Sequence, residues 1–352
     1  MTRRAATVVL NGLFALGMAF AVGMAPAWAQ SGDKALEDFF KGKAIDVFIG
    51  SAPGGGFDAY ARLVARHMGK YIPGNPSLVP KNMPGAGSAR AAAHLYAVAP
   101  KDGTAMGALF SGGIVDPLFD PAKRDQYDPT KFYYLGSANN EVATCMIWHA
   151  APVKTMAEAL QKEAILGASA SGGSSRDFAA SLANVLGAKI KLVSGYEGSK
   201  DMLLAMERGE THGICGQLWS SITTQSSDWI RDKKLHFWVQ MSLKPHPDLP
   251  QVPMVWEFVK NDRDRQVLEL IYGQLVFGRP YMLPPGVPAE RARALRDAFA
   301  KTMADPDYKT EAARSQLEVQ PVGGQEVQAL VEKMFAVDPA IAAAAAEAQK
   351  VK

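Results

Sequence analysis

IDVFIGSAPGGGFD, residues 45–58, is the stretch that decides the fold. Its apolar residues alternate up to Ile49, three glycines follow at 54–56, and a helical pattern of apolar residues begins at Tyr60. The stretch therefore predicts a strand, a glycine loop and a helix. Such a junction points free backbone N–H groups and the positive end of a helix dipole at one place, so its usual guest is an anion.

A second junction of the same kind lies further along the chain. An apolar run at 164–167 leads into a glycine and serine loop at 168–175, and a helix follows that Gly187 can close. Taken singly, each loop is more simply an ordinary turn between a strand and a helix. Together, in two similar lobes, the loops predict a clamp that holds an anionic ligand.

Strand and helix patterns alternate along the whole chain, in the proportions of an α/β protein. Strands are expected at residues 45–50, 77–81, 104–109, 133–137, 142–148, 164–167, 189–194, 235–240 and 275–278. Helices are expected at 58–70, 87–98, 156–162, 199–207 and 289–303. We also expect the alanine-rich tail from Asp338 to be helical and to pack across the first lobe.

The N-terminus has the features of a secretory signal peptide. Arg3 and Arg4 precede an almost wholly apolar run at 8–25, and a small-x-small cleavage site follows at 27–29. A membrane anchor is the weaker alternative, because no basic stop-transfer cluster follows the apolar run. We therefore expect residues 1–29 to be removed and the remaining chain to be exported to the periplasm.

Charge and hydropathy exclude several classes of partner. The 352 residues carry a formal net charge of only +3, and two of the basic side chains lie in the expected leader. This balance gives no support to nucleic acid or to an anionic membrane surface as partner. No segment after the leader is long and apolar enough to span a bilayer. Any preference for anions must come from a local site.

The chain has two cysteines, Cys145 and Cys215. In an oxidising compartment they can form a disulfide, but two buried thiols are the alternative, and sequence separation does not decide between them. Neither cysteine lies near the cleavage site, so a bacterial lipoprotein is not expected.

Catalytic motifs are scarce in the sequence. Neither glycine loop is followed by the Lys-Ser/Thr pair of a phosphate-binding P-loop. The segment Gly167-Ala-Ser169-Ala-Ser171 lacks the last glycine of a nucleophile elbow, and the six histidines form no metal-binding pair. We expect no enzyme activity, no catalytic residue, no metal and no cofactor.

The two loops instead offer hydrogen-bond donors for a carboxylate. Ser51 and the N–H groups of the first loop can surround an anion, since glycines allow close backbone approach. Asp58 is expected to be the N-cap of its helix, because a carboxylate there would repel an anion but satisfies free N–H groups. In the second loop, Arg176 could add a bidentate salt bridge.

Several short blocks carry a resemblance to a known family. PGGGFD at 53–58, NMPGAG at 82–87 and APKDGT at 99–104 are similar to the N-terminal signature of the tripartite tricarboxylate transporter substrate-binding proteins, the Bug family. The similarity continues through YDPTKF, GYEG, LPPGVP, ADP and PVGG, which start at residues 127, 195, 283, 304 and 321. These blocks cover nearly the whole chain after the leader.

The resemblance implies a two-lobed type II periplasmic-binding-protein fold with two hinge crossings, near residues 140 and 278. Lobe one would comprise 30–139 and 280–352, and lobe two 140–279. A monomer of this kind would enclose an organic carboxylate and deliver it to a permease with a large and a small membrane subunit. The ligand-binding residues implied are Ser51, Ala52, Pro53, Gly54, Gly55, Gly56, Phe57, Asp58, Ser111, Gly112, Gly113, Ser169, Ser171, Gly172, Gly173, Ser174, Ser175 and Tyr196. Gln217 is a further candidate, from a segment that departs from the family pattern.

The chain also departs from the family pattern. Ser51 and Ala52 stand where the family favours Phe-Pro, and 209–219 lacks the usual Gly-x-Val-Asp strand. A bulkier or aromatic acid is therefore open as ligand, with Trp219, Gln217 or His212 lining the pocket, although Trp219 can equally be a core residue. A periplasmic enzyme or sensor accessory acting on a small acid is the alternative function, and His212 is its one catalytic candidate.

Overall fold

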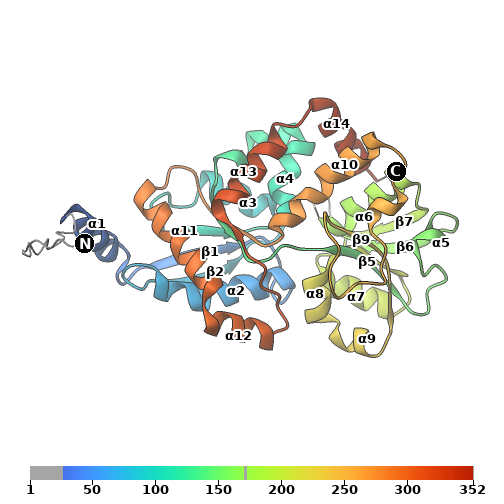
Figure 1. The fold of residues 1–352 in the computed structure, drawn as a ribbon, viewed down its shortest axis with the longest axis horizontal. Helices are drawn as coiled ribbons and strands as arrows, with labels where there is room; N and C mark the ends of the chain where they lie inside the picture. The colour runs from blue at the N-terminus through green and yellow to red at the C-terminus, as the bar shows by residue number, and fades with distance from the viewer. Residues whose placement is uncertain (1–26, 170–172, 352) are drawn as a thin grey trace, which may run out of the picture.

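The computed structural model describes residues 27–169 and 173–351, and its strands form two separate sheets (Figure 1). The first sheet has the strand order β11-β4-β10-β3-β1-β2. Its strands are β1 (Ala44–Ile49), β2 (Ser77–Asn82), β3 (Ala105–Ala108), β4 (Tyr133–Ser137), β10 (Pro280–Leu283) and β11 (Val322–Gly323). Since β10 and β11 follow every strand of the second sheet in sequence, the chain returns to complete the first lobe.

The second sheet has the order β7-β6-β8-β5-β9. Its strands are β5 (Ala143–Trp148), β6 (Ala164–Ala168), β7 (Ile190–Ser194), β8 (Gly213–Leu218) and β9 (Leu235–Met241). A disulfide between Cys145 and Cys215, whose Cα atoms are 3.7 Å apart, joins the neighbouring strands β5 and β8. Of the two states that the sequence leaves open for these cysteines, the structure has the bonded one.

Both sheets follow one plan. In the first, β2, β1 and β3 are parallel and β10 runs antiparallel between β3 and β4. In the second, β7, β6 and β8 are parallel and β5 runs antiparallel between β8 and β9. In each sheet this antiparallel strand follows the passage of the chain from the other lobe. The predicted α/β fold with two lobes and two crossings is confirmed, and the lobe boundaries at 139/140 and 279/280 stay a prediction.

Helices cover both sheets. The helices that precede, connect or follow the strands of the first sheet along the chain are α1 (Ala27–Phe40), α2 (Gly56–Met68), α3 (Ala89–Ala97), α4 (Ser111–Phe119), α11 (Ala289–Ala304), α12 (Pro306–Arg314), α13 (Gly324–Phe335) and α14 (Pro339–Ala348). Those next to the second are α5 (Met156–Ala159), α6 (Ser174–Leu186), α7 (Ser199–Glu207), α8 (Trp219–Gln225), α9 (Ser227–Arg231) and α10 (Asp262–Tyr272). Short 3₁₀ helices are η1 (Gly69–Tyr71), η2 (Ala86–Ser88), η3 (Pro121–Asp125), η4 (Pro129–Lys131), η5 (Val255–Phe258) and η6 (Gly273–Phe277). None of the described helices is long and apolar enough to cross a membrane.

Helix α2 shows how the sequence pattern produces the packing. Tyr60, Leu63, Val64 and Met68 recur at helical spacing, and all four are buried in the first-lobe core. Burying a side chain of this size contributes about 1.5–3 kcal/mol, so this face holds the helix on the sheet. The helix predicted at 58–70 is confirmed, and it begins two residues earlier, at Gly56.

Two predicted elements differ from the structure. Residues 275–278 were expected to form a strand, but η6 continues directly from α10, and Gln274 donates a side-chain hydrogen bond to the carbonyl of Ile271. An apolar run this short does not distinguish strand from helix. The tail helix α14 packs on α10, α6 and α4 rather than across the first lobe alone. Its end is held by Asn184 of α6, whose amide donates to the carbonyls of Ala348 and Lys350 at 2.9 and 2.8 Å.

Candidate functional site

Five helices begin where the parallel strands of the two sheets end. Helices α2 and α4 follow β1 and β3 in the first lobe, and α6, α7 and α8 follow β6, β7 and β8 in the second. Ligands of open α/β sheets bind beyond the carboxyl ends of such strands. Each helix start also carries N–H groups without an intrahelical acceptor and the positive end of a dipole. The arrangement suits an anion.

The two lobes meet at these helix starts. A Cβ added to Gly56 would collide with Ser221 of α8, and one added to Gly54 would lie 2.6 Å from the Lys200 ammonium of α7. Gly112 of α4 and Ser174 of α6 line one cavity of about 10 Å³, room for about one water. We call the predicted residues in 51–58, 111–113 and 169–175, with Tyr196 and Gln217, the interlobe site.

The first loop is held by Asp58, which is not the N-cap that the sequence predicted. Gly55 takes the N-cap position, and Asp58 lies in the first turn of α2. Its carboxylate accepts from the Gly54 N–H at 2.8 Å, from Arg62 at 2.9 Å and from the Asn82 amide at 2.8 Å. Gly54 has a φ of +80°, which turns its N–H toward the helix. The Asp58 carboxylate therefore accepts a hydrogen bond from the loop rather than from the first N–H groups of α2.

The bonds to Asp58 also fix its charge. Burial raises the pKa of the Asp58 carboxyl, but the hydrogen bonds from Arg62, Gly54 and Asn82 outweigh burial and lower that pKa overall. Asn82 donates a further bond to the carbonyl of Ser51 at 2.9 Å. Asp58 is thus a brace for the first loop, and its negative charge is offset by Arg62.

The other first-lobe residues of the site have mixed roles. Ser51 is buried, and its hydroxyl has no hydrogen-bond partner within the described part of the chain. The Phe57 ring packs edge-on against Phe110 at 4.3 Å. A Cβ on Gly113 would lie 2.6 Å from the carbonyl oxygen of Gly87, so this glycine is needed for packing of α4 against the 86–88 turn. Ala52, Pro53 and Gly112 complete the segments expected from the sequence.

The second loop is held by hydroxyl groups. The Ser175 hydroxyl accepts from the Ser169 N–H at 3.0 Å and lies 2.8 Å from the Ser169 hydroxyl. Gly173 is the N-cap of α6, and Ser174 starts the helix. Arg176, expected to reach the ligand, donates to the neighbouring Asp177 at 2.9 Å. Ser171 and Gly172 lie outside the described residues.

Tyr196 and Gln217 frame the second loop. The Tyr196 ring lies 3.4 Å from the position of a Cβ on Gly167, at the end of β6, and its N–H donates to the carbonyl of Ala168. Gln217 is half-buried near the end of β8, next to Gly216, where an added Cβ would collide with the carbonyl oxygen of Ser174. Strand β8 therefore supports the start of α6 closely.

Arg279 is the main residue that sequence reasoning missed. It is 1% exposed and lies between the lobes, where it donates to Glu141 at 2.7 Å and to the hydroxyls of Ser220 and Ser221 at 2.7 and 2.8 Å. Lys200 was missed as well. A signal for Arg279 exists in the sequence, since it is a single charged residue between the apolar runs of η6 and β10.

His212 lies away from the interlobe site, and the Trp219 side chain packs in a core cluster of the second lobe. The His212 ring accepts from the N–H of Ile165 at 3.1 Å, and the residue precedes β8, so it lies at the end of that strand opposite the interlobe site. The proposal that His212 lines the pocket or acts there as a catalytic base is therefore wrong. Trp219 is 5% exposed and packs against the rings of Phe237 and His246, which agrees with the core alternative.

A second polar cluster lies beside Trp219, where the loop after β9 meets the segment between α12 and β11. His246, Asp248 and Glu318 have ligand-type atoms within 4.8 Å of one another. The Nδ1 atom of His246 accepts from the backbone N–H of Asp248, so Nε2 carries the proton of the neutral ring and faces Glu318 Oε1 at 3.0 Å. This arrangement favours a histidine–carboxylate pair over a metal site.

No protein-family model and no curated protein sequence matches the chain. Among solved structures, the periplasmic binding protein BugD has a TM-score of 0.66 at 20% identity, covering 86% of this chain and 96% of its own. MatC from Rhodopseudomonas palustris with bound malate has a TM-score of 0.66 at 20% identity, covering 86% and 100%. An R. palustris protein with adipate has a TM-score of 0.62 at 20% identity, covering 84% and 94%. The chain therefore has the two-lobed fold of the periplasmic binding proteins.

Proposed function

We propose that the protein is a periplasmic substrate-binding protein of the Bug family that captures an organic carboxylate between its lobes. The observation that carries this proposal is that the starts of α2 and α4 in the first lobe lie against the starts of α7, α8 and α6 in the second. Backbone N–H groups and aligned dipoles stabilise an anion without a dedicated catalytic group. The structural neighbours with malate and adipate support a carboxylate as the anion.

The charged side chains around the site agree with this function. Asp58 pairs with Arg62, Asp177 with Arg176, and Glu141 with Arg279, so the acidic groups near the loops are offset. Lys200 is exposed and reaches toward the Gly54 backbone from the opposite lobe. A carboxylate bound at the start of α2 would lie close to this ammonium and could pair with it.

We further propose that residues 1–29 direct export, that the mature monomer is free in the periplasm, and that it delivers its ligand unchanged to the large and small membrane subunits of a tripartite transporter. The cleavage pattern at 27–29 supports export. Neither a cofactor nor nucleic acid has a role in this scheme.

A ligand screen tests the function. The mature protein is unfolded and refolded to remove carried-over ligand, and malate, adipate, citrate and benzoate are compared by thermal shift and calorimetry. At least one should raise the melting temperature, because a ligand that binds only the folded state stabilises it. Mass spectrometry of small molecules that co-purify with the unrefolded protein identifies the natural one. No stabilisation by any carboxylate, with no co-purifying acid, would contradict the proposal.

Gly55→Val tests the location of the site. A Cβ at Gly55 meets no atom of the described protein within 4 Å, and the residue has an ordinary φ of −87°. The valine should therefore leave the melting temperature within a few degrees of wild type while its side chain blocks the approach of the carboxylate to the α2 N–H groups, lowering affinity about tenfold or more. Gly323→Val, also with open space around its Cβ, is the matched control. Equal affinity in both variants would place the ligand elsewhere.

A further inference from the structure

Arg279 lies at the second crossing and is bonded to the first. Its N–H donates to the Ser137 hydroxyl at 3.0 Å, and its carbonyl accepts from the Ala138 N–H at 2.9 Å. Its Nε donates at 2.7 Å to Glu141, which lies on the first crossing and is itself fully buried. The two segments that connect the lobes are thus tied to each other at this residue.

The Arg279 guanidinium contacts both lobes. On the second-lobe side, its Nη2 donates to the hydroxyls of Ser220 and Ser221, at the start of α8. On the first-lobe side, its Cζ lies 4.1 Å from the ring centroid of Phe57 and 4.7 Å from that of Tyr60, both on α2. A planar guanidinium suits this use, because its edge donates hydrogen bonds while its face stacks on rings. Separation of the lobes must break one of these two sets of contacts.

The ligand-facing turn of α2 rests directly on the guanidinium. The position of a Cβ on Gly56 lies 3.3 Å from Arg279 Nη2 and overlaps Ser221, so only glycine fits. The same turn presents the N–H groups proposed to hold the carboxylate. A shift of the guanidinium therefore moves or frees the first ligand loop.

The internal bonds leave part of this charged cluster unsatisfied. Within the described residues, Arg279 Nη1 and Glu141 Oε2 have no hydrogen-bond partner, although both atoms are buried. Buried donors and acceptors without partners are costly, so the bonds to Ser220 and Ser221 matter to the stability of the closed arrangement. If the bonds to Ser220 and Ser221 were lost while the lobes stayed together, Nη2 of Arg279 would lack these partners, as Nη1 already lacks a partner within the described residues.

We propose that Arg279 is a positioning residue that couples ligand capture to lobe closure. With the lobes together, its guanidinium holds the start of α8 against the ligand-binding turn of α2, and Glu141 fixes its orientation. A carboxylate bound at that turn favours the same arrangement, so occupancy and closure stabilise one another. The proposal rests on the proposed function for the ligand alone, because the Arg279 contacts that hold the lobes together are all between groups of the protein.

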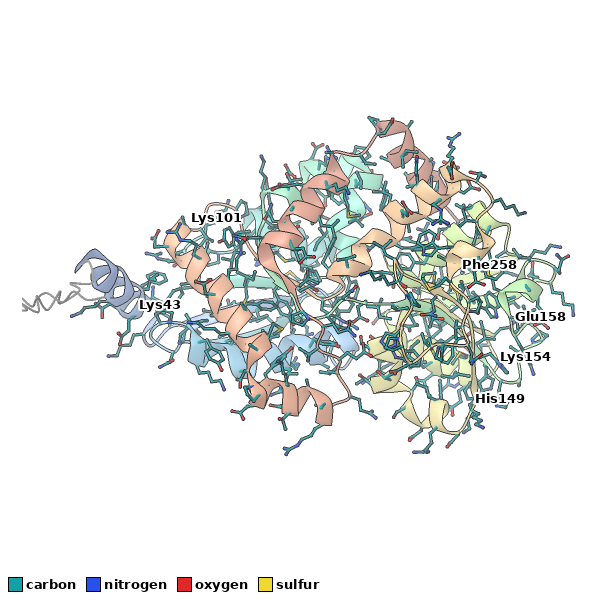
Figure 2. All side chains as sticks on the ribbon, viewed as in Figure 1. Lys43, Lys101, His149, Lys154, Glu158 and Phe258 are labelled. Carbon is teal, nitrogen blue, oxygen red and sulfur yellow. A yellow bond between two sulfur atoms is a disulfide. The ribbon has the colours of Figure 1, made fainter. Side chains whose placement is uncertain are left out.

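A distance measurement between the lobes tests the coupling. Spin labels replace Lys101 and Lys154, which are exposed and lie over the first and second lobe in Figure 2. Ser221→Ala removes one bond of the guanidinium, and Arg279→Lys removes its fork but keeps its charge. The matched control is Ser226→Ala, which removes a buried serine hydroxyl from the other end of α8.

In the ligand-free protein, the inter-label distances of Ser221→Ala and Arg279→Lys should shift to longer values than those of wild type and Ser226→Ala. Their affinity for the best carboxylate of the ligand screen should fall about tenfold and about hundredfold, respectively, because hydrogen bonds to charged groups are at stake. Ser221→Thr, which restores a hydroxyl, should recover the wild-type distances.

Wild-type distances in both variants would overturn the coupling. If Arg279→Lys does not fold, Ser221→Ala decides alone, since it removes only a hydroxyl. Failure of the wild-type protein to bind any carboxylate would instead overturn the proposed function, and it would leave the ligand-free distances interpretable.

Discussion

The first loop of the interlobe site is held by charged side chains and the second by hydroxyls, although both join a strand to the start of a helix. In the first lobe, Asp58 receives bonds from Arg62, Asn82 and the loop itself. In the second, the Ser175 hydroxyl bonds to both the N–H and the hydroxyl of Ser169. Charge-assisted bonds are roughly twice as strong as neutral ones, so each bond to Asp58 is expected to hold its loop more strongly than a bond between the two serines does.

The second loop is also supported by strand β8 of the sheet on which it rests. Gly216 brings the end of β8 against the carbonyl of Ser174, and the preceding residue, Cys215, is bonded to Cys145 of β5. A loop between a strand and a helix can thus be fixed either by hydrogen bonds to a side chain at the loop or by fixing the sheet on which it rests. The two lobes should therefore respond differently to the loss of these contacts.

Removal of the disulfide should have the largest effect on stability. The bond closes a loop with a sequence separation of 70, for which chain entropy predicts a contribution of about 4 kcal/mol. Cys145→Ala with Cys215→Ala should lower the free energy of unfolding by about this amount in urea titrations. Reduced wild-type protein provides the control, because it loses the bond without losing the sulfur atoms. A loss of less than about 1 kcal/mol in both would show that the sheet holds the second loop without the bond.

Loss of the Asp58 carboxylate should lower the free energy of unfolding less than loss of the disulfide does, but it should lower ligand affinity more. Asp58→Ala leaves Arg62, Asn82 and the Gly54 N–H without their shared acceptor, so we expect the free energy of unfolding to fall by about 2 kcal/mol. Ligand affinity should fall more than tenfold, because the loop no longer has one conformation. Urea titration and calorimetry measure the two effects.

The control for Asp58 is Asp46→Ala, which breaks the more exposed Asp46–Lys81 pair between β1 and β2. Exposed pairs contribute at most about 1 kcal/mol, so this variant should keep near wild-type stability and full affinity. Equal effects of the two substitutions would mean that Asp58 is not a brace of the ligand loop.

Loss of the second loop's hydroxyl bonds should have a smaller effect. Ser175→Ala removes the partner of the Ser169 N–H and should lower the free energy of unfolding by about 1 kcal/mol. Ser174→Ala, at the adjacent helix start, should leave stability unchanged and weaken ligand binding, since this hydroxyl is proposed to face the ligand. Melting curves and calorimetry on both variants separate the roles. The opposite result, with Ser174→Ala less stable and Ser175→Ala binding more weakly, would exchange the two assignments.

These contrasts explain how far the sequence could predict the site. Alternating strands and helices predicted both lobes, and the glycine loops predicted the two helix starts that follow β1 and β6, because such local patterns need only neighbouring residues. The brace of Asp58 depends on Asn82, from the end of another strand, and so Asp58 was taken for an N-cap. The Arg279 contacts join four segments distant in sequence, and periodicity carries no information on such a meeting.

The smallest expected effect is a pH dependence of the contact between the β9 loop and the C-terminal segment. Burial lowers the pKa of His246, but the hydrogen bond and charge of Glu318, with further contributions from Asp248 and Glu141, outweigh burial and raise that pKa above its usual value. Tyr60 holds the Glu318 carbonyl at 2.8 Å, so the pair ties the second lobe to a fixed part of the first.

Because the folded-state pKa of His246 is raised, the pair should stabilise the protein fully below the unfolded value near about pH 6.5 and lose this contribution as the pH rises through the folded-state pKa. We expect the free energy of unfolding to fall by less than about 1 kcal/mol over this window, since Glu318 is partly exposed. Glu318→Gln should remove this slope in urea titrations at successive pH values, whereas Glu210→Gln, an exposed glutamate of the second lobe, should retain it. If the free energy of unfolding of Glu318→Gln depends on pH as steeply as that of the wild type, the pH dependence belongs to another group than the His246–Glu318 pair.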